Sequence, residues 1–198
     1  FSTYIGGGDP NDFTNHEGDD WGLAIDLDSA NLVYICGFTE ADNFPVTPDA
    51  MQPNKAGGIT DGFICKVSTT GGGLLYSSYI GGSAADFAWG IDVDGNDKVH
   101  VSGYTASVDL VTSVNCFQST FGGVLDAFYY KMDMNNLGTN GPVIEYGTYL
   151  GFSGIDEFFD VKADDSGLVT LVGTTTTAVD ANFVMSAMGL AAPQPLNG

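Results

Sequence analysis

Short runs of alternating apolar and polar residues recur along the chain, and turn-forming residues bound each run. In residues 61–67, for example, Phe63, Cys65 and Val67 share one face. A period of two residues predicts strands that bury one face. No window of useful length shows the 3.6-residue period of a helix. The pattern therefore predicts an all-β chain.

The runs return in the same order three times, each time after a tyrosine motif: YIGG at 4–7, YIGG at 79–82 and YLGF at 149–152. The spacing defines repeats of approximately residues 1–76, 77–146 and 147–198, which we interpret as one repeat-built segment. Three sets of residues align between the repeats: Asp20, Asp86 and Asp156; Asp28, Asp94 and Asp164; and Gly37, Gly103 and Gly173.

Each repeat predicts four short antiparallel strands joined by turns. The first strands are residues 23–28, 90–94 and 160–164, and the second strands are 32–39, 99–105 and 169–175. The third strands are 61–67, 126–132 and a weaker echo at 180–188, and the fourth strands are 74–82 and 143–151. Four-stranded units of this size, repeated, are typical of β-propeller blades.

About three blades can be counted, and residues 1–7 match the end of a fourth strand that has no preceding strands of its own. Because propellers usually have about 4–8 blades, three blades do not easily close a ring. We therefore expect a partial propeller whose remaining blades belong to a longer chain. The alternative is half of a six-bladed dimer, a homo-oligomer in which residues 1–7 of each copy complete the third blade of the other.

The motifs around these strands resemble the bacterial SBBP repeats. The resemblance rests on YIGG, on GIDVD at 90–94, on VHVSGYT at 99–105, on DGFICKV at 61–67 and on NFPVTPDAMQ at 43–52. It covers nearly the whole chain, but the third repeat departs from it at Phe152 and Lys162. The resemblance implies a propeller scaffold in a large secreted or surface protein, and it implies no single activity.

The charge restricts the class of partner. The formal net charge is −20, from 25 acidic residues against five lysines and no arginine. Nucleic acids are excluded because phosphate binding needs clustered Lys or Arg. No apolar run approaches the length that spans a bilayer, so membrane insertion is not expected. An acidic surface suits an extracellular or cell-surface location, with a carbohydrate or a surface protein as the partner.

Residues 7–20 form the richest candidate site, and Ca²⁺ is the one cofactor that the sequence suggests. Carboxylate and amide oxygens are the ligands that Ca²⁺ prefers. The candidate ligands are Asp9, Asn11, Asp12, Glu17 and Asp19. A solvated polar loop is the alternative. For the aligned Asp20, Asp86 and Asp156 we instead predict a structural role, the capping of backbone N–H groups between blades. For DVDGND at 92–97 we predict a plain turn.

No metalloprotease, zinc-finger, nucleophile-elbow or phosphate-loop motif occurs in the sequence. We therefore predict a non-enzymatic module for binding, adhesion or structural scaffolding. The long links at about 8–19, 40–60 and 106–125 are expected to lie on one face of the blades. The alternatives are a carbohydrate-active hydrolase that uses carboxylates of this loop-rich face, and a subunit of a self-assembling extracellular polymer. Trp21 and Trp89 are expected to pack between blades or to stack on sugar rings. Cys36 and Cys65 are expected to be buried thiols, with a disulfide as the alternative.

Overall fold

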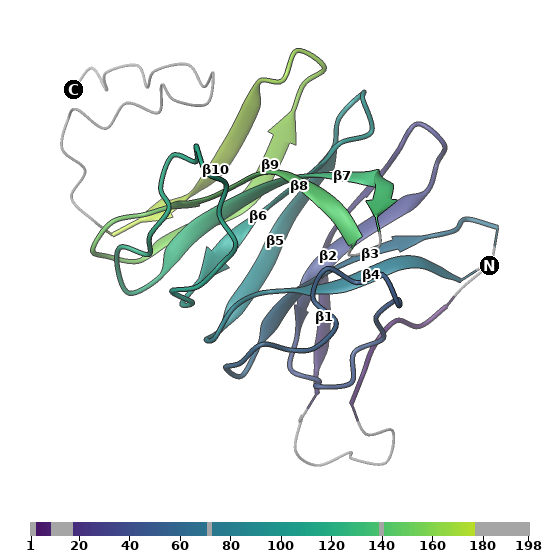
Figure 1. Ribbon diagram of the computed structural model, residues 1–198, viewed down its shortest axis with the longest axis horizontal. Helices are drawn as coiled ribbons and strands as arrows, with labels where there is room; N and C mark the ends of the chain where they lie inside the picture. The colour runs from purple at the N-terminus through teal and green to yellow at the C-terminus, as the bar shows by residue number, and fades with distance from the viewer. Residues whose placement is uncertain (1–2, 9–17, 71–72, 139–140, 177–198) are drawn as a thin grey trace.

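The computed structural model describes residues 3–8, 18–70, 73–138 and 141–176 (Figure 1). These residues form ten β-strands and no helix, as the alternation predicts. The strands are β1 (Asp20–Leu27), β2 (Val33–Thr39), β3 (Asp61–Val67), β4 (Leu74–Ile80), β5 (Asp86–Val93), β6 (Val99–Thr105), β7 (Asp126–Gly138), β8 (Gly141–Leu150), β9 (Asp156–Ala163) and β10 (Val169–Thr175).

The strands form three antiparallel sheets, one for each repeat. Sheet 1 has the order β1-β2-β3-β4, sheet 2 has the order β5-β6-β7-β8, and sheet 3 pairs β10 with β9. The four-strand unit expected from the sequence is thus confirmed in sheets 1 and 2. The weak third-strand echo at 180–188 and residues 9–17 lie outside the described residues.

The turn between the first two strands of each sheet is built the same way three times. In sheet 1, Asp28 Oδ1 accepts hydrogen bonds from the N–H groups of Ala30 and Leu32, at 3.0 and 2.8 Å. Asp94 and Asp164 do the same in sheets 2 and 3. The fourth turn residue has a positive φ in all three sheets: Asn31 at 61°, Asp97 at 56° and Gly167 at 87°. Residues that tolerate the left-handed region therefore fix these hairpins. Within the segment 92–97, Asp92 and Val93 end β5, and residues 94–97 form the predicted turn.

The aligned glycine of the second strand is required by a close approach of the first strand. A Cβ placed on Gly37 would lie 1.8 Å from the carbonyl oxygen of Trp21, and one on Gly103 would lie 1.9 Å from that of Phe87. Both glycines adjoin a β-bulge in the first strand. Because a bulge bends its strand toward the partner, no side chain fits at this position.

The three sheets lie face to face in chain order. Strand β5 contacts β1, β2 and β3, and β9 contacts β5, β6 and β7. Figure 1 shows the resulting succession of sheets, from sheet 1 in purple and blue to sheet 3 in yellow-green. The first strands β1, β5 and β9 thus follow one another through the stack.

The main core lies between sheets 1 and 2. Tyr34, Cys36 and Ile64 of sheet 1 are fully buried there against Val101 and Met132 of sheet 2. A second core joins sheets 2 and 3, and a third lies on the other face of sheet 1. Sheet 2 therefore packs on both of its faces.

Cys36 and Cys65 are buried free thiols, as expected, and the alternative of a disulfide between them is not found. The two cysteines lie on adjacent strands, but Cys36 pairs with Ile64 and Cys65 pairs with Ile35. An offset of one residue places their side chains on opposite faces of sheet 1.

Candidate functional site

The aligned aspartates at the start of each sheet cap backbone N–H groups, as the sequence predicts. Asp20 Oδ2 accepts the N–H of Gly7 at 2.6 Å, and Asp86 Oδ2 accepts that of Gly82 at 2.7 Å. Asp156 makes the same kind of contact at the next sheet junction, where its Oδ2 accepts the N–H of Phe152 at 2.8 Å. These carboxylates fix the chain where it passes from one sheet to the next.

A second pair of aspartates, which the sequence analysis did not single out, anchors the long loops. Asp61 Oδ2 accepts hydrogen bonds from Gln52 Nε2 at 2.7 Å and from the N–H of Ala56 at 2.9 Å. In sheet 2 Asp126 makes the corresponding contacts with Gln118 and Gly122. Their shared place at the start of DGF and DAF is the signal that could have found them.

Asp61 and Asp86 meet at Gly81, between sheets 1 and 2. A Cβ on Gly81 would lie 2.7 Å from Asp86 Oδ2 and 2.9 Å from Asp61 Oδ2, and neither aspartate is exposed. Burial raises the pKa of Asp86 to about 6; hydrogen bonds from Thr105, Gly82 and Ser107 oppose the rise, and the Asp61 charge adds to it. Burial also raises the pKa of Asp61. With no exposed oxygen, this carboxylate pair is closed to a substrate.

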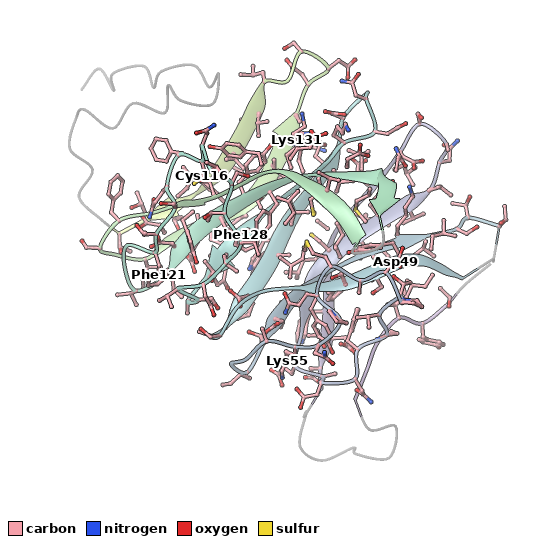
Figure 2. The ribbon with its side chains drawn as sticks, in the orientation of Figure 1. Asp49, Lys55, Cys116, Phe121, Phe128 and Lys131 are labelled. Carbon is pink, nitrogen blue, oxygen red and sulfur yellow. The ribbon has the colours of Figure 1, made fainter. Side chains whose placement is uncertain are left out.

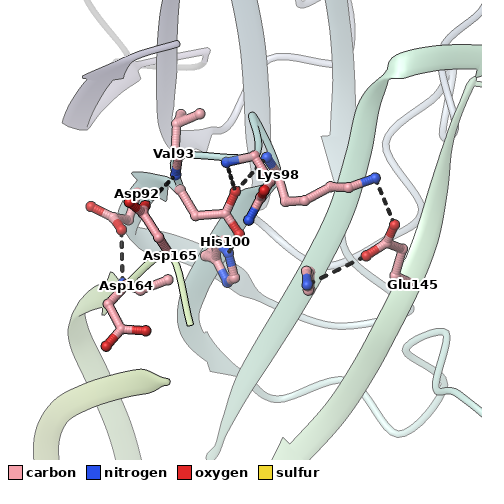
Figure 3. A network of polar contacts seen from close by, with 12 residues as sticks. Asp92, Val93, Lys98, His100, Glu145, Asp164 and Asp165 are labelled. Atoms are coloured by element: carbon pink, nitrogen blue, oxygen red, sulfur yellow. Dashed lines mark hydrogen bonds and ion pairs between the residues drawn. The ribbon is translucent and has the colours of Figure 1, made fainter. Parts of the chain in front are cut away.

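His100 is held in a buried polar cluster of sheet 2 (Figure 3). Its Nδ1 lies 2.7 Å from the Tyr129 hydroxyl, and its Nε2 lies 3.2 Å from Asp94 Oδ2. Burial lowers the pKa of His100, although the Asp94 carboxylate opposes this. The imidazole links the turn aspartate Asp94 to Tyr129 of β7. In sheet 1 the Tyr34 hydroxyl donates to Asp28 at the same position.

Further polar contacts join successive sheets and are repeated at both junctions. Asp26 Oδ2 of sheet 1 accepts the N–H of Val93 at 2.9 Å, and Asp92 Oδ2 of sheet 2 accepts that of Ala163 at 2.8 Å. Asp92 also pairs with Lys162. The turns add two more contacts, from the N–H of Ser29 to Asp97 and from the N–H of Gly95 to Asp165. Figure 3 shows Asp92, Val93 and Asp165 at these junctions.

The proposed calcium ligands lie mostly outside the described residues. Asp9, Asn11, Asp12 and Glu17 belong to residues 9–17, and Asp19 lies in the described part just before β1. The described ranges contain no group of three or more His, Cys, Asp or Glu side chains arranged to hold a metal ion. The calcium prediction therefore stays a prediction.

Aromatic rings link the three sheets. Phe38 of sheet 1 meets Phe87 of sheet 2 edge to face at 4.9 Å, and Trp89 of sheet 2 meets Phe159 of sheet 3 at 5.7 Å. Packing between sheets is the role that these contacts support for Trp89. Trp21 stacks on Phe38 at 6.0 Å and is 55% exposed.

The two long loops run beside the fourth strands and are fixed to them by matching hydrogen bonds. In loop 40–60 the N–H of Phe44 donates to the Tyr79 hydroxyl at 3.0 Å, and that hydroxyl donates to the Ala41 carbonyl at 2.8 Å. In loop 106–125 Tyr149 makes the same two contacts, with Leu110 and Ser107. Figure 2 labels Asp49 and Lys55 in the first loop and Cys116 and Phe121 in the second.

Loop 106–125 differs from loop 40–60 in its exposed residues. Three valines of loop 106–125, Val108, Val111 and Val114, are 68%, 62% and 100% exposed. Aligned on the shared hydrogen bonds, loop 40–60 has Asp42, Pro45 and Pro48 at these positions. Sequence reasoning missed the valines because their exposure depends on how the loop is fixed.

Val111 borders an apolar hollow of about 150 Å³ between sheets 1 and 2. Met51, Ile80, Tyr130 and Ile144 contribute most of the remaining lining. The hollow is large enough for a single side chain of a partner, and its lining is suited to an apolar one.

No protein-family model matches the chain, and no curated protein matches it either. The part of the chain that the structure describes contains no helix long and apolar enough to cross a membrane.

Proposed function

We propose that this chain is a non-enzymatic extracellular or cell-surface module of the β-propeller type, which binds a partner through loop 106–125. The propeller arrangement is supported by the face-to-face succession of four-stranded sheets and by inter-sheet contacts that recur at both junctions. The resemblance to SBBP repeats agrees with this arrangement.

The observation that carries the proposal is the set of exposed valines on a firmly held loop. The N–H groups of Leu110, Ser113 and Phe117 bond to Tyr149, Gly147 and Tyr146 of β8. Exposed apolar side chains on a fixed loop can bind a partner without a large loss of conformational entropy.

The net charge of −20 indicates what else the partner carries. Lys or Arg residues beside an apolar anchor would be attracted to the acidic surface, and an acidic partner would be repelled. A surface protein with an apolar side chain flanked by basic residues fits this description better than an anionic sugar does.

The hydrolase alternative gains no support from the paired carboxylates. Glycoside hydrolysis needs two carboxyl groups that reach the substrate. Asp61, Asp86 and Asp126 are all fully buried and accept hydrogen bonds from backbone N–H groups. Their contacts support a role in holding sheets and loops.

Selection of a displayed random peptide library on the immobilised chain tests the binding proposal. We expect enriched peptides with one large apolar residue beside Lys or Arg. Val111→Asp should weaken their binding at least about tenfold, since an apolar contact is replaced by a charge. Pro45→Asp, at the aligned position of loop 40–60, is the matched control and should leave binding unchanged.

Equal binding of the selected peptides to Val111→Asp would show that the loop is not the site. Incubation with neutral polysaccharides addresses catalysis in parallel. Release of reducing ends by the purified chain would contradict the non-enzymatic proposal.

A further inference from the structure

Sheet 1 has an apolar outer face that is partly exposed, whereas the corresponding face of sheet 2 is covered by sheet 1. Ile25 of β1 is 67% exposed, whereas the aligned Ile91 of β5 is 3% exposed. Val33 and Ile35 of β2 are half-buried, while the aligned Val99 and Val101 of β6 are completely buried. We call Ile25, Leu27, Val33, Ile35 and Val67 the outer face of sheet 1.

The covering of sheet 2 shows what this kind of face accepts. Tyr34, Cys36, Ile64, Tyr76 and Ile80 of sheet 1 lie over it. The junction of sheets 2 and 3 repeats the arrangement, with Leu150 at the end of β8 in the place of Ile80 at the end of β4. In both cases the last apolar residue of a fourth strand packs on the next sheet.

Residues 3–7 correspond in sequence and in packing to the end of a fourth strand, but the other three strands of its sheet are absent from the described residues. Ile5 aligns with Ile80 and Leu150, and it packs on the core of the outer face with Phe44 and Phe63. Residues 3–7 pair with no strand in the described part of the chain. A hollow of about 160 Å³, bordered by Thr3, Ile5, Val67 and Leu74, lies beside them.

Tyr4 gives a second and independent indication. The aligned Tyr79 and Tyr149 are each 1% exposed, and their hydroxyls fix the long loop of their own sheet. Tyr4 is fully exposed. No loop of the described residues is therefore held at the position that fixes the long loop in the two complete sheets.

We propose that the outer face of sheet 1 docks one further sheet of this same repeat, three strands and their long loop, to which residues 3–7 add as the fourth strand. The docked sheet covers Ile25 and Leu27, and its long loop forms hydrogen bonds with the Tyr4 hydroxyl. This inference rests on the stacked-sheet arrangement of the proposed function, and it adds the chemistry of one partner.

The residues that face the next sheet indicate the type of repeat required. In sheets 1 and 2 these positions hold a small residue, Ala24 or Gly90, and a carboxylate, Asp26 or Asp92. A Cβ on Gly90 would lie 2.7 Å from Asp160 Cα, so the sheets approach closely at this point. A docking sheet must therefore present a small residue there.

Sheet 3 does not meet this requirement, which argues against a second copy of the chain as the occupant. Its aligned residues are Asp160 and Lys162, and exposed Thr170 stands where Tyr34 and His100 are buried. A charged residue at the point of close approach would be buried without a partner. The occupant is thus a repeat of the type of sheets 1 and 2.

An extended chain provides the test. Residues 83–145, the first three strands of sheet 2 with their loop and hairpin, are placed directly ahead of residue 1, which aligns with Tyr146. Ile25→Ala is then compared in the extended and the original chain. We expect the substitution to lower the melting temperature of the extended chain by roughly 5 °C or more and that of the original chain by less than about 2 °C. Tyr4→Phe should likewise lower the melting temperature of the extended chain and leave that of the original chain unchanged.

A second extension, with residues 18–75 of the first repeat ahead of residue 1, guards against a failure of one junction to fold. Equal effects of Ile25→Ala in extended and original chains, or the failure of both extensions to melt together with the rest of the chain, would overturn the proposal. So would an Ile25-dependent dimer of the original chain in light scattering, because the occupant would then be a second copy. None of these results bears on peptide binding at Val111, so the two proposals fail separately.

Discussion

Sheets 1 and 2 are built from the same repeat with the same register, turns and aspartate contacts, but they differ in their neighbours. Sheet 2 is packed between sheets 1 and 3, whereas sheet 1 packs on another sheet through one face only in the described part of the chain. The aligned Ile25 and Ile91 are therefore exposed and buried, respectively. Burial in a stacked repeat is thus set by position in the stack as well as by sequence.

The largest expected effect is the difference in stability loss between Ile91→Ala and Ile25→Ala. Ile91→Ala should lower the free energy of unfolding by about 2–5 kcal/mol, because it opens a cavity between two sheets. Ile25→Ala should cost less than about 0.5 kcal/mol, since its side chain is mostly in water already. Urea denaturation of the two variants measures both values, and equal losses would contradict the one-sided packing of sheet 1.

The next effect concerns the sheet junction at Asp86. Its folded pKa, about 6, lies above the unfolded value of about 3.9, so the folded protein binds this proton more tightly. The resulting stabilisation is complete below about pH 4 and is lost as the pH rises through 6. Relative to Asp86→Asn, the chain should lose up to roughly 3 kcal/mol between pH 4 and pH 7. A stability difference that stays constant over this range would show that Asp86 is not a buried acid of this kind.

The smallest of these effects concerns the tyrosine hydroxyls. Tyr79→Phe and Tyr149→Phe each leave a buried backbone N–H and a carbonyl without a partner, and they should cost about 1–3 kcal/mol. Tyr4→Phe should cost less than about 0.3 kcal/mol, because Tyr4 is fully exposed. Thermal melts of the three variants make the comparison, and a loss for Tyr4→Phe equal to the others would mean that Tyr4 already holds a loop.

The strands, the turns and the aspartate caps could be predicted from the sequence because each depends on local spacing. The strands were predicted from alternation, the turns from the aligned Asp28, Asp94 and Asp164, and the cap from the recurrence of Asp86 at the start of its repeat. The same reasoning left Cys36 and Cys65 open, because one residue of register decides which face each occupies.

The candidate binding loop and the bare face could not be predicted in this way. Val108, Val111 and Val114 read as ordinary loop or core residues until the hydrogen bonds to β8 fix which way the loop faces. Ile25 and Ile91 lie in similar sequences, and each is followed by an aspartate, Asp26 or Asp92. Their exposure differs because another sheet packs on Ile91 and none of the described sheets packs on Ile25. Neighbours are a tertiary property, and so the alignment of repeats could not distinguish the two residues.

Native-state hydrogen exchange of the intact chain tests the one-sided packing of sheet 1, because it reports the opening of each strand separately. The amides of β5 and β6, which lie between two sheets, should exchange slowest. The amides that pair β1 with β2 should exchange at least about tenfold faster, since no other sheet of the described residues covers the outer face of that pair. Protection of β1 and β2 equal to that of β5 and β6 would contradict the packing of sheet 1 on another sheet through one face only.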